Sequence, residues 1–564
     1  MLGKKKLLLL TLILLLVACG PLWGSPALNG AIPSQDVGPG SNTLTPFQPK
    51  GSLPPSTVTA NPVVGEPTQT SVPQFLWISP AVPDKLRQSA LASGLPLAVE
   101  SAAATLRLDI SRATDSASAT WIYALVAPFP TTTDGVSLAE LQNSWAGASN
   151  GPFAGRPLWM DEPTLAAFTA LWGAPAVGRV SVASADLLVD SAWADRPAWG
   201  IIPFEALDPR WKVLSVDDQS PLHNDFNPAA YPLKISFSLQ PPAFLLISGN
   251  RDLGKLTVLA MTGTTALVRA TADRMEKHGV LYPGEGIRTV LRAADITHIS
   301  NEISFMADCP TPDPWTESLR FCSNPRYIAL LEDVGTDVVE LTGNHLLDYG
   351  QAPFLNTLDM YDQHNWLYFG GGRDLQDSLQ PALVEDHGNK LAFIGCNFAG
   401  PPNDWATDSS PGSAPCDFTE LETEIAGLRL QGYLPVMTFQ YNEYYQSFPT
   451  VEERQDFLEM ASAGAVIVSG SQAHMPASME FSAGTFVHYG LGNLFFDQMS
   501  HLMSDGSLIY DTRNVFVDRH VFYDGRYIGT ELLTYIIEDY ARPRPMTGPE
   551  RLEFLQNIFS AAGW

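Results

Sequence analysis

The sequence predicts an α/β protein with two consecutive globular domains behind an N-terminal segment that belongs to neither core. Three observations lead to this fold class. Short apolar runs of strand length alternate with stretches of helical spacing from Phe75 onwards. A chain of 564 residues exceeds one ordinary hydrophobic core, because domains average roughly 150 residues. The hydrophobic fraction of 45% is high enough to build such cores.

The charge composition excludes one large class of function. The chain carries 60 acidic and 33 basic side chains, which gives a net charge of −27. Nucleic-acid binding requires lysine and arginine side chains to displace counterions from phosphates. The acidic excess therefore argues against a nucleic-acid partner.

Residues 1–18 have the organisation of a bacterial export signal. Three lysines at positions 4–6 precede the apolar run 7–18, which is too short for a stable membrane span. The run ends in Leu16-Val17-Ala18-Cys19-Gly20, which resembles the lipobox of bacterial lipoproteins. The resemblance implies a lipid on Cys19 and a location outside the cytoplasm, anchored to the bacterial cell membrane. The alternative is an ordinary signal peptide with a chance cysteine.

Residues 19–73 are rich in Pro, Ser, Thr and Gly and carry few charges. Such a stretch cannot bury enough apolar area to offset the entropy lost on ordering. We expect a disordered, extended stalk that holds the globular part away from the membrane.

The first globular domain is expected at residues 74–248. Buried strands are predicted at 121–126, 198–204 and 211–214, and helices at 137–145 and 162–172. Ser184 is a candidate cap for a helix that runs to Ala194. The order of these segments loosely resembles the second half of type 2 periplasmic solute-binding proteins. That resemblance implies a smaller α/β domain with a solute-binding character.

The second domain is expected at residues 250–564. Its predicted strands are 256–261, 337–341, 391–394, 435–439 and 465–468, and its predicted helices are 265–278, 418–430 and 451–463. A β-rich region from 484 to 537 and a last amphipathic helix at 549–561 complete it.

Polar residues follow the ends of several of these strands. The segments concerned are 261–265, 294–302, 337–350, 440–444, 470–474 and 489–498. The carboxyl ends of successive strands in an α/β sheet meet in one crevice. The spacing therefore predicts a single site within the second domain.

The order and spacing of these motifs resemble the CapA family, named for poly-γ-glutamate capsule synthesis. The most specific matches are Asn344-His345 with Asp348-Tyr349-Gly350, and Gly492-Asn493 with Asp497-Gln498. The resemblance spans about residues 250–510. It implies a layered α/β/β/α fold like that of calcineurin-type metallophosphatases. It also implies a part in synthesis, export or anchoring of a capsule polymer, with that polymer or its synthesis proteins as partners.

Several metal-binding positions of the family pattern hold other residue types. Thr264 stands where the family has Asp, Gln440 where it has His, and Gln472 where it has the inner His of its G-x-H-P-H motif. Thr and Gln are neutral oxygen donors and replace carboxylate and imidazole poorly around a transition metal. The replacements favour a metal-free pocket. The alternative to the capsule role is an envelope solute- or polymer-binding protein without catalytic activity.

The alternative to a metal-free pocket is one divalent metal ion held by Glu302, Asn344, His345 and His474. In a hydrolytic site His345 or His474 would serve as the acid or base. The pocket residues implied by the resemblance are Thr264, Gln440, Glu443, Gln472, Asn493 and Asp497. A structural role competes for each: Glu302 as a structural acid, His345 as a helix cap, and Asn493 and Asp497 as loop-fixing residues.

Four cysteines remain after Cys19, and an even number in an exported protein indicates disulfides. The short loops favour the pairs Cys309–Cys322 and Cys396–Cys416, and a metal site built from all four thiolates is the alternative. Among the histidines, His298 has apolar neighbours and is expected in the core, whereas His520 lies outside the motifs and is expected at the surface.

Overall fold

The computed structural model describes residues 73–112 and 118–564. The predicted export signal, the lipobox residue Cys19 and the stalk up to residue 72 lie outside the described residues. No described helix is long and apolar enough to cross a bilayer.

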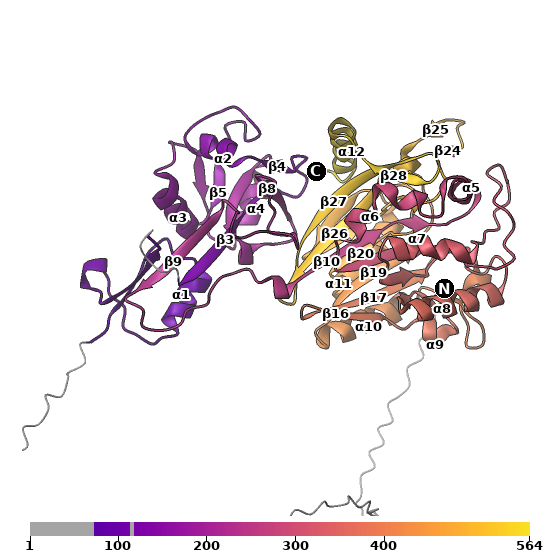
Figure 1. Cartoon of the computed structure of the whole chain (residues 1–564), viewed down its shortest axis with the longest axis horizontal. Helices are drawn as coiled ribbons and strands as arrows, with labels where there is room; N and C mark the ends of the chain where they lie inside the picture. The colour runs from indigo at the N-terminus through magenta and orange to yellow at the C-terminus, as the bar shows by residue number, and fades with distance from the viewer. Residues whose placement is uncertain (1–72, 113–117) are drawn as a thin grey trace, which may run out of the picture. The chain divides into compact units, whose positions relative to one another are not determined.

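The first sheet is built from residues 76–240 and has the strand order β1-β2-β9-β3-β7-β5-β6, with β8 paired to β3 and β4 (Figure 1). Its strands are β1 (Leu76–Ile78), β2 (Leu106–Ile110), β3 (Ala119–Pro128), β4 (Gly135–Val136), β5 (Leu158–Met160), β6 (Val180–Val182), β7 (Trp199–Pro203), β8 (Trp211–Val216) and β9 (Lys234–Gln240). The helices of this region are α1 (Asp84–Leu91), α2 (Leu138–Trp145), α3 (Glu162–Trp172) and α4 (Leu188–Ala194). The strands and helices of this region form an α/β unit.

Most of the predicted elements of this region are present. The run 121–126 lies in β3 and is buried throughout. Helix α2 begins after Ser137, which forms a capping box with Glu140. The prediction that Ser184 caps the next helix was wrong, because Ser184 accepts a turn hydrogen bond from Leu187 and α4 begins only at Leu188.

The second sheet has the order β14-β13-β12-β10-β26-β27-β28, with β11 joined to β12 and β23. Its strands are β10 (Leu256–Thr262), β11 (Thr264–Thr265), β12 (Ile296–Asn301), β13 (Val338–Glu340), β14 (Leu367–Phe369), β23 (Asn493–Phe495), β26 (Asn514–Tyr523), β27 (Arg526–Glu538) and β28 (Arg542–Pro545). Strands β10 and β26, far apart in the sequence, pair antiparallel, whereas β10, β12, β13 and β14 run parallel.

The third sheet has the order β16-β17-β19-β20-β22-β21. Its strands are β16 (Ala382–Asp386), β17 (Asn389–Asn397), β19 (Leu434–Gln440), β20 (Ile467–Ser469), β21 (Met479–Ser482) and β22 (Thr485–His488). The four central strands are parallel, and the two edge strands are antiparallel to their neighbours. Two short ribbons, β15 (Gly371–Gly372) with β18 (Gly412–Ser413) and β24 (His501–Leu502) with β25 (Leu508–Ile509), complete the strands of this domain.

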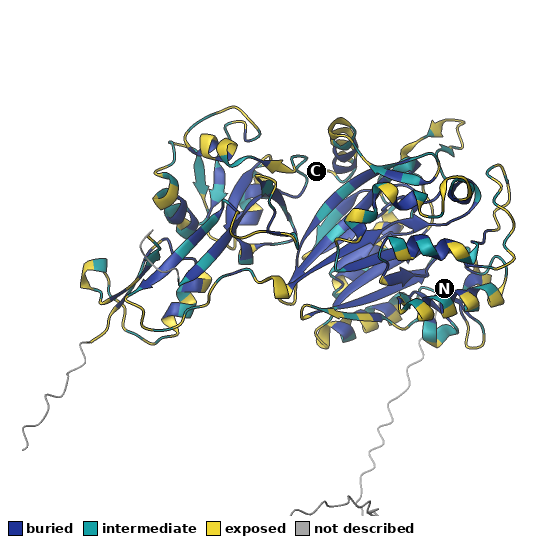
Figure 2. Ribbon diagram, viewed as in Figure 1, coloured by how far each residue is buried: buried dark blue, intermediate teal, exposed yellow. Residues whose placement is uncertain are grey.

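Three apolar cores define the layers formed by the second and third sheets and their helices. The core between the two sheets contains Met261 and Val338 from the second sheet and Phe393 and Val436 from the third. The outer face of the second sheet is covered by α5 (Arg269–His278), α6 (Arg288–Leu291), α7 (Ile328–Asp333) and α8 (Gln351–His364). The outer face of the third sheet is covered by α10 (Phe418–Leu430) and α11 (Val451–Ala463). Figure 2 shows buried strands between helices whose outer sides are exposed, so the predicted α/β/β/α layering is confirmed.

Two helices remain, α9 (Leu375–Ser378) and α12 (Gly548–Ala561). The predicted helices 418–430 and 451–463 match α10 and α11 to the residue. The prediction of one helix over 265–278 was wrong at its start. Thr264 and Thr265 form β11, which suits the β-branched threonine side chain, and α5 begins at Arg269.

His520 is buried, with 1% of its surface exposed, so the expectation of a surface position was wrong. The reason is the position of β26 between β10 and β27, where alternate side chains face the core between the sheets. His298 is fully buried in β12, as predicted.

Both predicted disulfides are present, Cys309–Cys322 and Cys396–Cys416. The first closes an insertion after β12, and the second joins the end of β17 to the start of α10. The alternative of a four-thiolate metal site is therefore excluded.

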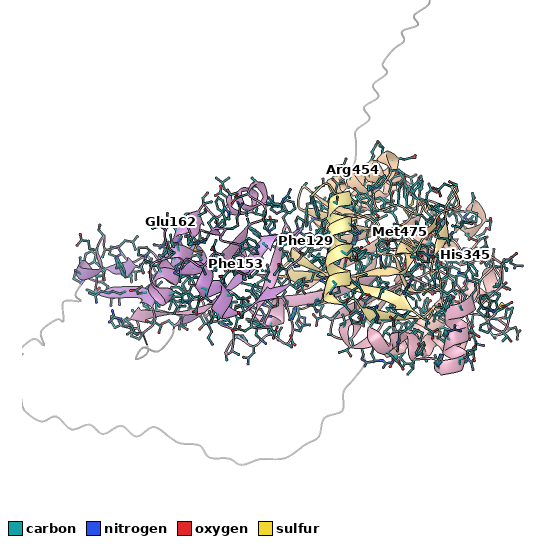
Figure 3. All side chains as sticks on the ribbon, turned by 90° about the horizontal axis from the view of Figure 1, so that it is seen from above. Phe129, Phe153, Glu162, His345, Arg454 and Met475 are labelled. Carbon is teal, nitrogen blue, oxygen red and sulfur yellow. A yellow bond between two sulfur atoms is a disulfide. The ribbon has the colours of Figure 1, made fainter. Side chains whose placement is uncertain are left out.

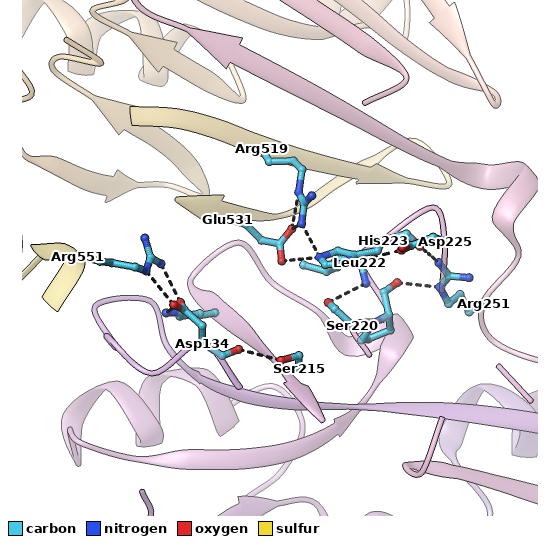
Figure 4. A network of polar contacts seen from close by, with 12 residues as sticks. Asp134, Ser215, Ser220, Leu222, His223, Asp225, Arg251, Arg519, Glu531 and Arg551 are labelled. Atoms are coloured by element: carbon cyan, nitrogen blue, oxygen red, sulfur yellow. Dashed lines mark hydrogen bonds and ion pairs between the residues drawn. The ribbon is translucent and has the colours of Figure 1, made fainter. Parts of the chain in front are cut away.

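A polar network joins the first sheet region to the C-terminal strands and α12 (Figure 4). Asp134 accepts hydrogen bonds of 2.8 Å from Nε and Nη2 of Arg551 and one of 2.7 Å from Nζ of Lys212. Glu531 pairs with Arg519 and with Nε2 of His223. Burial alone would raise the pKa of Asp134 and of Glu531, but their basic partners outweigh it and hold each pKa at about 2.

Candidate functional site

The sequence motifs between residues 261 and 498 lie at the carboxyl ends of strands of the second and third sheets. Thr264 of β11 lies opposite Ser300 of β12 and Asn493 of β23 in the strand register. Gln440 is the last residue of β19, and Gln472 follows β20. Side-chain contacts described below connect the two sheets at this edge, where the carboxyl ends of parallel strands lie together.

Glycines allow the motifs to approach closely. A Cβ on Gly263 would lie 1.8 Å from the carbonyl oxygen of Gly492, and a Cβ on Gly343 would lie 2.7 Å from Cα of Glu302. Any larger residue would push the first motif away from the closing motif, or the third away from the second.

His474 lies at the centre of the site. Its Nε2 atom is 3.5 Å from Oε1 of Glu302 and 3.5 Å from Oε1 of Glu443. Its Nδ1 atom lies 2.7 Å from Oδ1 of Asn493. The Asn493 Nδ2 group donates to the backbone oxygens of His474 and Thr512 at 3.0 and 3.1 Å, so Oδ1 faces Nδ1 as the acceptor. This arrangement directs Nε2 towards the two carboxylates.

The charges around His474 favour an imidazolium between the carboxylates of Glu302 and Glu443. Burial would lower the pKa of His474, but the charges of Glu443 and Glu302 outweigh it and raise the pKa to about 9. Burial would raise the pKa of Glu302, but the charges of His474 and His345 outweigh it and lower the pKa. Both groups are therefore charged at neutral pH.

His345, which is labelled in Figure 3, lies close enough to Glu302 for their charges to interact. Its Nδ1 atom is 2.8 Å from Oδ2 of Asp348, which also accepts a 2.6 Å bond from the backbone N–H of Phe321. The Phe321 ring packs 4.6 Å from the imidazole. Burial lowers the pKa of His345, but the hydrogen bond to Asp348 and the charge of Glu302 outweigh it, so the pKa is raised.

The three replaced family positions share an unusual property. Thr264, Gln440 and Gln472 are each at most 1% exposed. Among the described residues, none of the polar atoms Thr264 Oγ1, Gln440 Oε1 and Nε2, or Gln472 Oε1 and Nε2 has a hydrogen-bond partner. Ser300 Oγ, Glu302 Oε2 and Asn344 Oδ1 are buried without a partner as well. Native proteins leave few buried polar groups unpaired, so this cluster requires an explanation.

The donor set does not fit a pair of transition-metal ions. Neutral oxygens stand at three positions where the resemblance implies carboxylate or imidazole, and the amide N–H groups of Gln440 and Gln472 offer no lone pair to a metal. Within the described ranges, the ligand atoms of Glu302, His345 and His474 do not form a group of three within 4.8 Å of one another. The group that does consists of Asp295, Asp386 and His387, which are partly or fully exposed.

Asp497 has a positioning role. It accepts from Nε of Arg269 at 3.1 Å and from the backbone N–H of Ala270 at 2.8 Å, and so binds the start of α5. The Arg269 guanidinium lies over Phe321 at 4.9 Å and over Phe496 at 5.0 Å. These contacts match the loop-fixing role considered for Asp497.

The sequence reasoning missed a buried acid beneath the site. Glu340, fully buried at the end of β13, accepts hydrogen bonds from Ser471 and, at 2.7 Å, from Thr342. Its Oε2 lies 3.1 Å from Nε2 of His298. An acid at the end of an apolar strand, just before the Asn344-His345 motif, was the available signal. The Ser471–Glu340 contact links the third sheet to the second.

Tyr445 also belongs to the site and was not predicted. Its hydroxyl donates to Glu443 at 2.7 Å and accepts from Gln498 at 2.8 Å. Its ring stacks on His501 at 3.5 Å. Tyr445 therefore connects the loop after β19 to the loop after β23.

Comparison with known proteins supports the motif assignment. Residues 258–498 match the family described as bacterial capsule synthesis protein PGA_cap. The PGA biosynthesis protein CapA of Bacillus subtilis (strain 168) is 24% identical over 226 residues, which cover 40% of this chain and 59% of that protein. The capsule biosynthesis protein CapA of Bacillus anthracis is 22% identical over 267 residues, which cover 46% of this chain and 64% of that protein. The chain thus spans less than two thirds of either relative.

Solved structures have a partial likeness to the chain. A hypothetical protein from Thermus thermophilus has 13% identity and a TM-score of 0.31, and covers 50% of this chain and 100% of its own. A 5'-nucleotidase precursor from the same organism has 14% identity and a TM-score of 0.28, and covers 54% of this chain and 59% of its own. An ABC-type phosphate transport receptor from Vibrio cholerae has 15% identity and a TM-score of 0.25, and covers 30% of this chain and 88% of its own.

Proposed function

We propose that the chain, whose residues 258–498 match the bacterial capsule synthesis protein family, acts in the biosynthesis, export or anchoring of an envelope polymer of the poly-γ-glutamate type. The observation that carries the proposal is the approach of residues from three family motifs, with His474 3.5 Å from Glu302 and 3.5 Å from Glu443. The two disulfides support a location outside the cytoplasm, because thiols stay reduced inside it.

In this proposal the strand-end site handles the polymer rather than cleaving it. The replaced residues Thr264, Gln440 and Gln472 remove the ligands that a two-metal hydrolase would need. Among the charged groups that remain, His474 lies 3.5 Å from a carboxylate oxygen of Glu302 and 3.5 Å from one of Glu443. Such a site favours binding and positioning.

The proposal is tested by deleting the coding region in the producing bacterium and measuring glutamate in surface polymer after acid hydrolysis. We expect the surface polymer to fall several-fold and to be restored by the full chain supplied in trans. Unchanged polymer amount and chain length in the deletion strain would refute the proposal. A strain that carries the Gly263→Val variant tests the strand-end site itself, because the added side chain would separate Gly263 from Gly492.

We also propose that the protein is held at the membrane by a lipid on Cys19, as the lipobox resemblance implies. Membrane fractionation should find the wild-type protein in the membrane pellet and the Cys19→Ser variant outside it. Mass spectrometry of the mature N-terminus gives an independent readout. Equal pelleting of both proteins with no lipid on Cys19 would contradict this anchor.

A second candidate function is ligand binding where the first sheet region meets the C-terminal strands. A cavity of about 360 Å³ lies there. Its wall combines apolar side chains, such as Phe129, Met546 and Phe559, with the charged groups of Lys212 and Arg551. Pockets at such junctions commonly bind small molecules through an apolar wall with a few polar groups.

A thermal-shift screen of the full chain against anions, sugars and glutamyl peptides tests this candidate. A ligand of this cavity should raise the melting temperature of the wild type and should fail to do so in Met546→Trp, where the larger side chain fills the space. Met503→Trp, in the ribbon of β24 and β25, is the matched control. No shift with any compound, or a shift kept in Met546→Trp, would contradict the candidate.

A further inference from the structure

The cavity of about 360 Å³ beside β27 and α12 contains more basic than acidic side chains. Its permanent cations are Lys212, Arg519 and Arg551, and its carboxylates are Asp134 and Glu531. His223 also lines the cavity and adds no negative charge. This balance is the reverse of that in the whole chain, whose net charge is −27. A local excess of positive charge in so acidic a protein points to an anionic ligand.

Two of the cations share one carboxylate that is more exposed than they are. Asp134 pairs with Arg551 (Figure 4) and with Lys212. The side chains of Lys212 and Arg551 are 14% and 18% exposed, whereas that of Asp134 is 55% exposed. Water therefore screens the charge of Asp134 more strongly than those of its partners. Arg519 and Glu531 form a separate, balanced pair, so the uncompensated charge belongs to Lys212 and Arg551.

Lys212 retains an unused hydrogen-bond donor. Its Nζ atom donates to the backbone oxygen of Thr131 at 2.7 Å and to Oδ1 of Asp134 at 2.7 Å. A lysine ammonium carries three N–H groups, and no described residue accepts the third. Burial lowers the pKa of Lys212 to about 8, although the charge of Asp134 opposes this shift. An anion beside Nζ would accept the third hydrogen bond and favour the charged form.

The remaining wall of the cavity is mainly apolar. Phe129, Leu555 and Phe559 line it and are each at most 6% exposed. An apolar group that enters this space leaves water, which is favourable. A volume of about 360 Å³ lies at the lower end of the range of small-molecule sites, so it suits a compact ligand rather than a polymer segment.

The charges and the apolar wall together select the class of ligand. A cation would be repelled by Lys212 and Arg551. A neutral apolar molecule would leave the third N–H group of Lys212 unpaired. A polyanion would bring more negative charge into the cavity than one unmatched cation can balance. A monoanion with an apolar body satisfies both parts of the wall.

We propose that this cavity binds a small amphipathic monoanion, whose charged head lies on Lys212 and whose apolar body lies against Phe129, Leu555 and Phe559. The inference rests on the second candidate function given above, because it names the ligand class of the same cavity. A medium-chain carboxylate has this chemistry.

The first experiment measures binding to the purified full chain by calorimetry. Octanoate is compared with octanol and octylamine, which have the same alkyl chain and a neutral or cationic head, and with acetate, which lacks the chain. We expect octanoate to bind about tenfold or more tightly than each of the others, since it alone meets both parts of the wall. Equal affinity for octanol, octylamine or acetate would overturn the proposal.

Two substitutions should change the affinity in opposite directions. Lys212→Met keeps an apolar stem but removes the charge, so octanoate should bind about tenfold more weakly, whereas Lys212→Arg should retain binding. Asp134→Asn removes the carboxylate that competes for Lys212, so octanoate should bind several-fold more tightly. Octanol binding should be the same in all three variants.

The opposite directions separate a ligand-binding role from a structural one. Lys212→Met and Asp134→Asn both remove an ion pair, so both should melt at a lower temperature than the wild type without ligand. Weaker octanoate binding in both variants would show that the pair only holds the fold and would refute the proposal. Lys277→Met, whose lysine is 56% exposed on α5 and paired with Asp273, is the matched control and should change neither quantity.

The position of the ligand is tested with the cavity-filling variant. Met546→Trp should abolish octanoate binding and Met503→Trp should not, and binding that survives in Met546→Trp would refute the proposal. A neutral or cationic compound that raises the melting temperature of the wild type and not of Met546→Trp would support the candidate function and refute the ligand class. No shift with any compound, octanoate included, would contradict both, whereas the surface-polymer proposal is judged separately by the deletion strain.

Discussion

His474 Nδ1 and Asn493 Oδ1 lie 2.7 Å apart, and this hydrogen bond sets the direction of the other imidazole nitrogen. The asparagine is itself held by two backbone oxygens, those of His474 and Thr512. A residue that the sequence comparison placed in the closing motif is thus the support for a residue of the preceding motif.

Replacing Asn493 by Ala should destabilise the fold. Asn493 is fully buried, and its loss would leave the His474 and Thr512 backbone oxygens without their donor. Unsatisfied buried groups cost about 1–3 kcal/mol each, so we expect a loss of about 3 kcal/mol in urea unfolding followed by tryptophan fluorescence. Asn356→Ala, exposed on α8, is the control and should change the free energy by less than about 0.5 kcal/mol. Equal urea midpoints for Asn493→Ala and Asn356→Ala would contradict the role of Asn493 in supporting His474.

Replacing Asp497 by Ala should loosen the start of α5. The carboxylate is only 7% exposed and binds the Arg269 guanidinium and the Ala270 N–H. Removing one partner of such a pair leaves a poorly solvated charge, and we expect a loss of about 3 kcal/mol. Hydrogen exchange should accelerate in residues 269–278 and not in α10. Asp505→Ala, at an exposed position, gives the baseline. Unchanged exchange in α5 would show that Asp497 does not hold the helix.

Acidification should weaken the network around Glu531. Its pKa in the folded protein is about 2, below the ordinary value of 4.5, since Arg519 and His223 outweigh burial. A depressed pKa contributes stability that is present above pH 4.5 and is lost as the pH falls towards 2. We expect up to about 3 kcal/mol of the unfolding free energy to disappear over this window. The unfolding free energy of the Glu531→Gln variant should depend less steeply on pH from pH 5 down to about 2. An identical slope in the variant and the wild type would rule out Glu531 as the source of the pH dependence.

Removing the Cys396–Cys416 bond should destabilise the third sheet. The bond closes a separation of 20 residues, and a loop of about that length contributes about 3 kcal/mol by restricting the unfolded chain. The Cys396→Ala/Cys416→Ala variant should unfold at correspondingly lower urea concentration than the oxidised wild type. Added reductant should lower the urea concentration at which the wild type unfolds, towards that of the variant. Reductant also breaks Cys309–Cys322, and the effect of that bond is separate. A variant as stable as the oxidised wild type would contradict the expectation.

The boundaries predicted from sequence hold where local signals and tertiary context agree. Helix α11 begins after Thr450, whose capping box with Glu453 is visible in the sequence, and ends at Gly464, which adopts the left-handed conformation. Thr265 lacked such a signal: the helical spacing continued through it, but pairing with Asn301 and Phe495 made it a strand residue. His520 was misplaced for a similar reason, since only the pairing of β26 with β10 and β27 puts it in the core.

The candidate site also has properties that the sequence predicts and properties that depend on tertiary structure. The motifs allowed their own placement at strand ends to be predicted, because the carboxyl ends of parallel strands lie at the same edge of a sheet. They could not predict that Gln440 and Gln472 are buried without a hydrogen-bond partner in the described part of the chain, nor that Glu340 lies beneath the site. Those properties depend on how two separate sheets close on each other.

The contact between Gly263 and Gly492 has a consequence for how the protein is made. The two residues are separated by most of the second domain, and β10 needs β26, further along the chain, as its neighbour. Closing such long loops is slow and comes after local structure has formed. We therefore expect a partly synthesised chain to form local helices and the first sheet before the strand-end site is complete, because the closing motif at Gly492 is needed to build that site.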